Sequence, residues 1–243
     1  TLATKEAEKK GLDPDFIVDM MFWTIPIGII GARIYYVLFE LDYYLQNPGE
    51  IIQIWNGGIA IYGALIAGIL TIYWYTKRKG ISFALILDIL APAVLIAQSI
   101  GRWGNFMNQE AHGEEVSRAF LENLFLPEFI IEQMNINGIY YHPTFLYESL
   151  WSLAGFVLIL FLRRKEQLLR VGEVMFTYVM WYSFGRFFIE GMRTDSLYLF
   201  GPIRVSQALS ILLFLGAMGV WAYRRRNNYP PDPFYTNITR KEA

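Results

Sequence analysis

GGIAIYGALIAGILTIYWYT, residues 57–76, is the stretch that decides the fold class of this chain. It contains no charged residue, so a helix formed by it has no charged face to turn toward water. A bilayer core about 30 Å thick is crossed by about 20 mainly apolar residues in a helix. Residues 57–76 therefore favour a membrane-spanning helix over the core helix of a water-soluble protein.

Apolar runs of similar length recur along the chain, and 54% of its residues are hydrophobic while only 18% are charged, unlike a typical water-soluble domain. We therefore predict an all-α fold, a polytopic integral membrane helix bundle. Its six visible spans lie near residues 17–39, 57–76, 83–100, 145–162, 171–190 and 203–223.

Lysine and arginine concentrate on the cytoplasmic side of membrane proteins, and their distribution here predicts the orientation. Basic residues gather at 5–10, 77–79, 163–170 and 224–226, whereas residues 101–144 contain two arginines. We predict a transmembrane domain over residues 1–226, with the 101–144 segment outside the cytoplasm. Residues 227–243 are expected to form a polar cytoplasmic tail that trails from the last helix without folding.

Charge and cysteine content exclude several classes of function. Lys and Arg number 21 against 22 Asp and Glu, which leaves no basic surface for a nucleic-acid backbone. With no cysteine, the chain has no disulfide, no thiolate metal site and no cysteine nucleophile of its own. The spacing of Ala60, Ala64 and Gly68 by four predicts a face on which another helix packs closely.

Charged side chains at membrane depth cost about 2.5 to 3.5 kcal/mol each on insertion scales, so each is a functional candidate. Asp19, Asp88 and Glu173 lie near cytoplasmic helix ends, where we expect capping or snorkelling. The other polar candidates map to the outer third of the spans, where they can converge on one site: Arg33, Arg102, Glu110, His142, Glu148, Arg186, Glu190 and Arg193.

The densest cluster, GRWGNFMNQEAHG, covers residues 101–113 where the third span meets the outer surface. Its glycines, Gly101, Gly104 and Gly113, permit close or left-handed backbone. Hydrogen-bonding groups come from Arg102, Asn105, Asn108 and Glu110. The segment is either a functional site or an interfacial turn anchored by an arginine.

Two further clusters accompany it. Residues 182–195, YSFGRFFIEGMRTD, place Arg186 and Glu190 four residues apart on one helix face, as an internal ion pair or as part of a site. Two arginines from different helices, Arg102 and Arg186, would form a forked cradle for a phosphate, and a phosphate at the outer leaflet points to a phospholipid. Residues 142–148, HPTFLYE, open the fourth span; Glu148 there suits helix capping, and His142 is an interfacial or a site histidine.

The 101–113 cluster matches the pattern GRxGNFxNxExxG, and GGIAIYGALIAG, HPTFLYES and GRFFIEGMRTD occur around it. In these motifs, over essentially its whole length, the chain resembles the prolipoprotein diacylglyceryl transferases. The resemblance implies a seven-helix enzyme of the bacterial plasma membrane with its N-terminus outside and an outward-facing catalytic cavity. This chain looks as if it lacks the first of those helices.

The resemblance also implies the reaction. A diacylglyceryl group passes from phosphatidylglycerol to the lipobox cysteine thiol of a prolipoprotein signal peptide, which forms a thioether and releases glycerol phosphate. No metal or redox cofactor is called for. The partners implied are phosphatidylglycerol, the prolipoprotein and the lipid bilayer, at a site that faces the outer leaflet.

The resemblance assigns roles residue by residue. Arg102 matches the phosphatidylglycerol-binding arginine, and Arg186 with Glu190 matches the second essential arginine and its neighbouring carboxylate. The remaining motif positions give the other catalytic and substrate-binding candidates: Asn105, Glu110, Gly113, Tyr182, Arg193, His142 and Glu148.

One position departs from the family pattern. Tyr62-Gly63-Ala64 stands where the family usually has His-Gly-Gly, and that histidine is the usual candidate for deprotonating the thiol. A phenol, with a reference pKa near 10 against about 8.5 for a thiol, is a poorer base at neutral pH. Three alternatives for the base stay open. Tyr62 takes the proton with its phenolate stabilised by nearby arginines, or His142 or a carboxylate such as Glu110 takes it instead. In the third alternative the thiol ionises without a dedicated base.

Two other classes of function compete with the transferase. A transporter or flippase of an anionic lipid would use Arg102, Arg186 and Glu190 as binding and coupling groups. A scaffold that docks lipoprotein precursors would use residues 101–144 as a receptor surface. The transporter predicts movement of the lipid without covalent change, and neither class explains the 101–113 motif.

Overall fold

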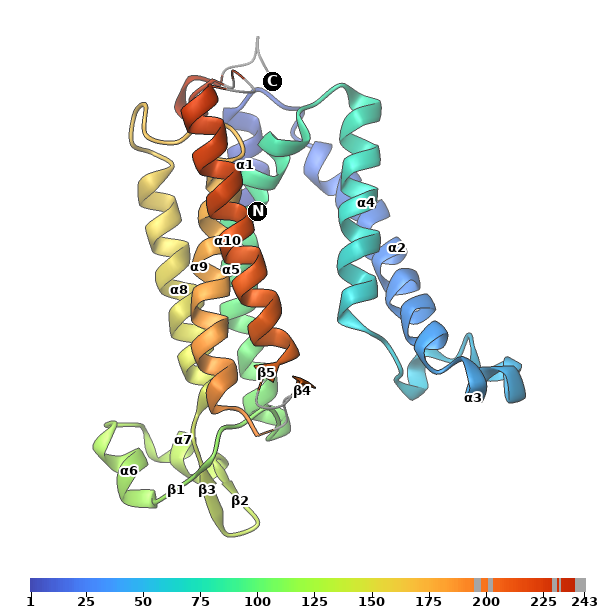
Figure 1. Cartoon of the computed structure of the whole chain (residues 1–243), viewed down its shortest axis with the longest axis vertical. Helices are drawn as coiled ribbons and strands as arrows, with labels where there is room; N and C mark the ends of the chain where they lie inside the picture. Colours follow the sequence, from blue (N-terminus) through green and yellow to red (C-terminus); the bar gives the residue numbers. More distant parts are fainter. Residues whose placement is uncertain (195–197, 201–202, 229–230, 232, 239–243) are drawn as a thin grey trace. The chain divides into compact units, whose positions relative to one another are not determined.

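The computed structural model describes residues 1–194, 198–200, 203–228, 231 and 233–238 (Figure 1). The chain divides into two compact units, Thr1–Ile86 and Leu87–Asn237. Each unit is held together by long helices, as the apolar runs predict.

The first unit contains α1 (Leu2–Lys9), α2 (Phe16–Phe39) and α4 (Ile61–Lys79), with α3 (Leu41–Gln46) and the short 3-10 helices η1 (Pro48–Glu50) and η2 (Ile54–Asn56) between α2 and α4. Helix α4 ends at Gly80 in the left-handed conformation, directly after the basic residues Lys77, Arg78 and Lys79. The guanidinium of Arg78 lies over the ring of Trp74, 4.4 Å from the ring centre, a cation–π contact at this helix end.

Small residues bring α2 and α4 into backbone contact. The predicted face is confirmed, since the Ala60 amide donates to the Ala32 carbonyl at 3.1 Å and Gly68 packs on Thr24. The closest approach lies one residue away, where a Cβ on Gly63 would be 2.3 Å from the carbonyl oxygen of Gly31. Because lipid supplies no hydrophobic drive between helices, this close packing is what holds the pair together.

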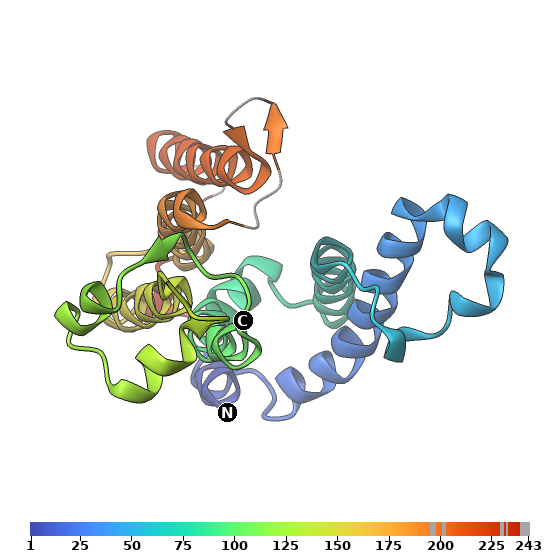
Figure 2. The same cartoon turned by 90° about the horizontal axis from the view of Figure 1, so that it is seen from below.

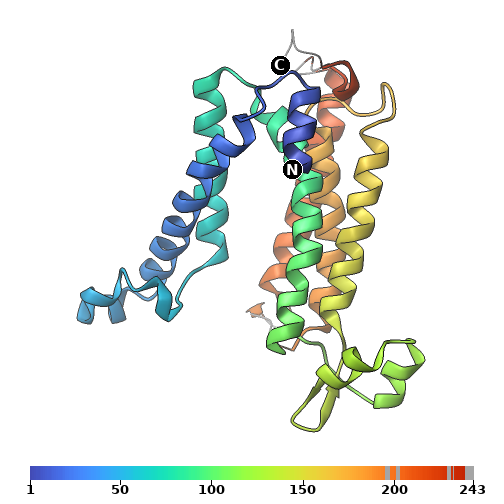
Figure 3. The same cartoon turned by 180° about the vertical axis from the view of Figure 1, so that it is seen from behind.

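In the second unit α5 (Phe83–Asn108, which begins in the first unit), α8 (Thr144–Leu162), α9 (Glu173–Met192) and α10 (Val205–Asn227) run side by side (Figures 1 and 3). Figure 2 looks along these helices from the end that carries the 109–143 segment. Two short strands, β4 (Tyr198–Phe200) and β5 (Ile203–Arg204), precede α10.

The segment between α5 and α8 folds into a small cap. It contains β1 (Glu115–Val116), α6 (Arg118–Asn123), α7 (Glu128–Gln133), β2 (Asn135–Ile136) and β3 (Ile139–Tyr141), with the strands in the order β1-β3-β2. Asn137 and Gly138 both have positive φ, as a two-residue hairpin turn requires. The cap shares one apolar core with the ends of α5 and α8: Phe106, Leu121, Ile130, Ile131, Met134 and Phe145.

Within the described part of the chain, four helices, α2, α5, α8 and α10, are long and apolar enough to cross a membrane. The chain is therefore a polytopic membrane protein with a mostly helical fold. Helices α4 and α9, with 19 and 20 residues, lie at the two other predicted spans. That these two also cross the membrane stays a prediction.

Buried acidic residues cap the basic end of the second unit, as expected. The Asp88 carboxylate accepts hydrogen bonds from the Gly172 and Met175 amides at 2.6 and 2.8 Å, which satisfies the first turn of α9 from a different helix. Glu173 accepts from the Arg170 amide at 2.8 Å and pairs with Arg225 of α10. These contacts join α5, α9 and α10.

The expectation that the tail trails without folding was wrong for residues 233–238. The Val171 amide donates to the Pro233 carbonyl at 3.0 Å, and the Tyr235 amide donates to Leu169 at 2.8 Å. The Arg170 guanidinium lies 5.8 Å from the centre of the Phe234 ring. The prediction failed because amino-acid composition gives no information on backbone hydrogen bonds such as these to the α8–α9 loop. Within this segment lies the 3-10 helix η3 (Tyr235–Asn237).

Candidate functional site

Glu148, in the first turns of α8, lies at the centre of a buried charged cluster. Its two carboxylate oxygens contact different helices: Oε2 is 2.6 Å from Nε of Arg102 on α5, and Oε1 is 2.8 Å from Nη1 of Arg186 on α9. The Glu148 side chain is 8% exposed, against 23% for Arg102 and 16% for Arg186. The two arginines of the predicted phosphate cradle thus meet through one shared carboxylate.

Two more charged groups, Glu190 and Arg193, belong to the cluster. Nη2 of Arg186 is 2.5 Å from Oε2 of Glu190, one helical turn away, and Nη1 of Arg193 is 3.9 Å from Glu148. Three guanidinium groups thus lie around the Glu148 carboxylate. A guanidinium pairs with a carboxylate or a phosphate through parallel hydrogen bonds, so this arrangement suits the binding of a phosphate.

The end of α5 extends the cluster through amide side chains. Nη1 of Arg102 donates to Oδ1 of Asn105 at 3.3 Å, and Nδ2 of Asn105 donates to Glu110 at 3.0 Å. Asn108 reaches the same Glu110 oxygen at 3.3 Å. A cavity of about 10 Å³ adjoins Asn105 and Glu110, with room for about one water.

The glycine expectations hold at one position of three. Gly101 and Gly104 lie within helix α5, and a Cβ added at either would meet no atom within 4 Å, so the expected close or left-handed backbone was wrong at both. Left-handed backbone occurs instead at Gln109 and Ala111. Gly113 does permit a close approach, since an added Cβ would lie 2.5 Å from Cβ of His142.

Gly113 joins the cap to the end of α9. It forms a β-bridge with Arg193, and its amide donates to the His142 carbonyl at 3.0 Å. His142 Nδ1 lies 3.3 Å from the Tyr147 hydroxyl, and its ring packs edge-on against Phe120. His142, Gly113 and Arg193 are therefore neighbours, although Gly113 and Arg193 are 80 positions apart in the sequence.

Polar groups continue from Arg186 along α9 toward the middle of the bundle. Tyr182 precedes Arg186 by one turn and stacks with Tyr178, with ring centres 6.1 Å apart. The Tyr178 hydroxyl accepts from Gln98 of α5 at 3.2 Å, and Oε1 of Gln98 is buried without a hydrogen-bond partner. Sequence reasoning missed Gln98 and Tyr178, although both continue the helical spacing of Arg102 and Tyr182.

Arg33 and Tyr62 belong to the first unit. The Arg33 guanidinium donates to four carbonyls of the α2–α4 connection, those of Glu50, Ile51, Gly57 and Gly58, at 2.6 to 2.8 Å. These bonds give Arg33 a role in fixing its own loop. The Tyr62 ring lies 6.4 Å from that of Tyr35 and is 39% exposed.

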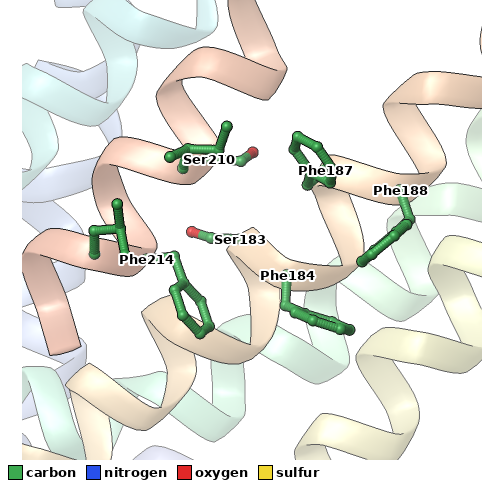
Figure 4. A pocket seen from close by; sticks show the side chains of 8 residues that line it. Ser183, Phe184, Phe187, Phe188, Ser210 and Phe214 are labelled. Atoms are coloured by element: carbon green, nitrogen blue, oxygen red, sulfur yellow. The ribbon is translucent and has the colours of Figure 1, made fainter.

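An apolar groove lies between α9 and α10 (Figure 4). It has a volume of about 290 Å³ and is lined by six apolar side chains and two serines. The Ser210 hydroxyl donates to the Ser206 carbonyl at 2.7 Å, whereas Oγ of Ser183 is buried without a partner. None of the charged cluster residues lines this groove, so we do not assign the groove to the site.

Fold and site together define a polytopic membrane protein in which charged side chains from three helices meet at one end of a bundle. The opposite end of the same bundle carries the basic residues that follow α8 and end α10. A family model described as prolipoprotein diacylglyceryl transferase matches residues 1–223. The chain belongs to this family.

Curated relatives agree with the family match. A phosphatidylglycerol–prolipoprotein diacylglyceryl transferase of Listeria welshimeri is 61% identical over 230 residues, which cover 95% of this chain and 82% of the relative. Proteins of the same name from Bacillus velezensis and Lactobacillus gasseri are 58% and 56% identical, over 94% and 93% of this chain and 83% and 81% of their own lengths. The predicted family and enzyme class are therefore confirmed.

Proposed function

We propose that the chain transfers the diacylglyceryl group of phosphatidylglycerol to the lipobox cysteine of a prolipoprotein signal peptide, at the outer leaflet of the bacterial plasma membrane. The names of its relatives support both substrates. The observation that carries the assignment to a site is the Arg102–Glu148–Arg186 bridge. It brings two guanidinium groups together near the start of α8, at the opposite end of the bundle from the basic residues, which supports a phosphate site at the outer leaflet.

In the proposed site, the lipid phosphate displaces the Glu148 carboxylate from one or both arginines. A planar guanidinium pairs with phosphate through two parallel hydrogen bonds, and Arg186 already presents both terminal nitrogens to carboxylates. Arg193 lies near enough to share the phosphate charge. Glu190 holds Arg186 in place from the next turn.

The chemical step exchanges one bond for another. The substrate's thiolate sulfur attacks the glyceryl carbon that bears the phosphate ester, so a C–S bond forms as the C–O bond breaks. Glycerol phosphate leaves with the electron pair, and the thiol proton passes to a base. The guanidinium groups of Arg102 and Arg186 stabilise the charge that develops on the leaving phosphate, which is often the largest single contribution to catalysis.

Several groups support this arrangement. Asn105 links Arg102 to Glu110, while Gly113 brings the cap against Arg193. Tyr182 lines the same face of α9 as Arg186, one turn deeper. His142 and Glu110 lie in the same unit as the arginines and are candidate bases. Tyr62, in the first unit, is the third candidate.

The test uses the purified chain in phosphatidylglycerol-containing micelles with a lipobox peptide. Mass spectrometry should detect a diacylglyceryl adduct on the peptide cysteine and none on a peptide with serine in its place. Absence of the adduct, even when the chain is supplied with the N-terminal segment of a relative, would contradict the transferase. Movement of the lipid across vesicles without adduct formation would instead support a flippase.

A further inference from the structure

Two pairs of reciprocal hydrogen bonds join the helices that carry the charged cluster. The first joins α8 and α9: Nε1 of Trp151 donates to the Trp181 carbonyl at 2.9 Å, and Nε1 of Trp181 donates to the Trp151 carbonyl at 2.9 Å. The two indole rings stack with centres 4.2 Å apart and planes within 12°. Each side chain therefore binds the backbone of the opposite helix.

Glycine makes this contact possible on both helices. Trp151 is followed four residues later by Gly155, and Trp181 is followed four residues later by Gly185. A Cβ on Gly185 would lie 2.2 Å from Nε1 of Trp151, and one on Gly155 would lie 2.3 Å from Nε1 of Trp181. Any side chain at either glycine would displace the opposite indole, so the four residues specify one separation of α8 and α9.

The second contact joins α5 and α8 in the same manner. The Ser99 hydroxyl donates to the Ser149 carbonyl at 2.9 Å, and the Ser149 hydroxyl donates to the Ser99 carbonyl at 2.9 Å. Both serines are buried, with exposures of 6% and 5%. In an apolar environment these bonds fix the two helices at one axial register, because a shift would leave buried polar groups unpaired.

The charged residues of the site are close in sequence to the residues that form these contacts. Ser149 is the neighbour of Glu148, and Trp151 is three residues beyond it. Arg102 is three residues after Ser99, and Arg186 follows Gly185. Each of the three helices that supply the Arg102–Glu148–Arg186 bridge is thus pinned within one turn of its charged residue.

We propose that Trp151, Trp181, Ser99 and Ser149 are positioning residues of the transferase: they set the separation and register of α5, α8 and α9 and so hold Glu148 between Arg102 and Arg186. The inference rests on the proposed function, because it assigns the pinned arginines to the lipid phosphate. None of the four side chains contacts the substrate in this account. They act through the placement of the arginines.

The test measures the KM for phosphatidylglycerol and kcat in the lipobox-peptide assay. Gly185→Ala should raise KM about tenfold or more, because displacements near 1 Å at a positioned group cost up to about a hundredfold. Trp151→Phe keeps an aromatic ring but removes the N–H and the smaller ring of the indole without creating a collision, so a smaller rise of about threefold is expected. Ser99→Ala should raise KM by a similar factor. Gly216→Ala on α10, where an added Cβ meets no atom within 4 Å, should leave KM unchanged.

A second comparison tests the geometry. In Gly185→Ala the harm comes from the collision with the Trp151 ring, so the double variant Gly185→Ala/Trp151→Ala should be no worse than Trp151→Ala alone. A purely structural role would lower the amount of folded, active enzyme and leave KM at the wild-type value. If Gly185→Ala does not fold, Trp151→Phe and Ser99→Ala carry the test.

The inference is overturned if the folded variants, judged by helical circular dichroism and monodisperse elution, show wild-type KM. It is also overturned if the effects of Gly185→Ala and Trp151→Ala simply add. Failure of the proposed function is distinguishable, because the wild-type chain would then form no thioether adduct at all.

Discussion

Nη1 of Arg186 lies 2.8 Å from Oε1 of Glu148, across the contact between α9 and α8. The other oxygen of the same carboxylate binds Arg102 on α5, so one buried anion neutralises two cations from different helices. In the proposed mechanism the lipid phosphate takes over this task. In that mechanism, Glu148 holds the two arginines in place while the lipid is absent.

Glu148→Gln tests this exchange. The variant leaves the arginines without their shared counter-charge, and breaking a buried pair costs about 3 kcal/mol or more, so the free energy of unfolding should fall. Because the phosphate can restore the missing charge, phosphatidylglycerol should raise the thermal midpoint of the variant more than that of the wild type. Glu173→Gln, which removes a buried partner of Arg225 at the other end of the bundle, is the matched control and should show the wild-type lipid response. Equal lipid responses in all three proteins would contradict the exchange.

Arg186→Lys separates charge from shape. Lysine keeps the positive charge but loses the planar fork that contacts Glu148 and Glu190 together. Turnover should fall by about ten- to a hundredfold, on the scale seen when one preorganised donor is lost. The exposed Arg164, changed to lysine, should leave turnover unaltered. Unchanged turnover in Arg186→Lys would contradict the fork.

Tyr62→Phe decides between the candidate bases. The change removes only the hydroxyl from a residue that is 39% exposed, so the fold should be retained. A rate loss of about a hundredfold or more would support Tyr62 as the base, on the usual scale for general base catalysis. Full activity would exclude it and leave His142, Glu110 or no dedicated base, which His142→Gln and Glu110→Gln then separate.

The cap should loosen in acid. Arg118 binds Glu122, Glu128 and Glu132 together, and its hydrogen bond holds the pKa of the Glu132 carboxyl below the ordinary value of 4.5. Since the folded-state pKa is lowered, this contribution to stability is complete above pH 4.5 and is lost as the pH falls through the folded-state pKa. Hydrogen exchange of cap amides, corrected for intrinsic rates, should show this loss, and Arg118→Met should flatten the pH dependence. An unchanged acid profile in Arg118→Met would contradict the assignment.

The sequence predicts the helices well and their contacts only in part. Hydropathy alone locates α2, α4, α5, α8, α9 and α10 to within a few residues at most ends, because lipid-length apolar runs permit few other structures. The end of α5 is the exception. The glycine-rich 101–108 stretch continues the helix, since glycine weakens a helix by only about 1 kcal/mol and packing can offset this.

The candidate site was predictable as a set of residues but not as a network. Charges at membrane depth identify Arg102, Arg186 and Glu190 without any structure. Glu148 was interpreted partly as a helix cap, because its position near the start of α8 fits the helix dipole equally well. Only the three-dimensional structure shows it between two arginines that are 84 positions apart in sequence.

The helix contacts that frame the site were not predicted. The Trp151–Gly155 and Trp181–Gly185 pairs share one spacing, but apolar helices contain many such pairs by composition alone. The spacing indicates a contact only when two helices pack against each other in the axial register that places each tryptophan against the glycine of the other helix. The folded tail segment was missed for a related reason, since its bonds to Leu169 and Val171 involve backbone that composition does not describe.

The most direct test of the central claim, that Arg102 and Arg186 around Glu148 form the phospholipid site, is adduct formation by Arg102→Ala. The purified variant is incubated with phosphatidylglycerol micelles and lipobox peptide, with the wild type and Arg164→Ala as parallel controls. The mass of the peptide is then measured by mass spectrometry. The account predicts a diacylglyceryl adduct with the wild type and Arg164→Ala, and none above background with folded Arg102→Ala. An adduct formed by Arg102→Ala at the wild-type rate would contradict it.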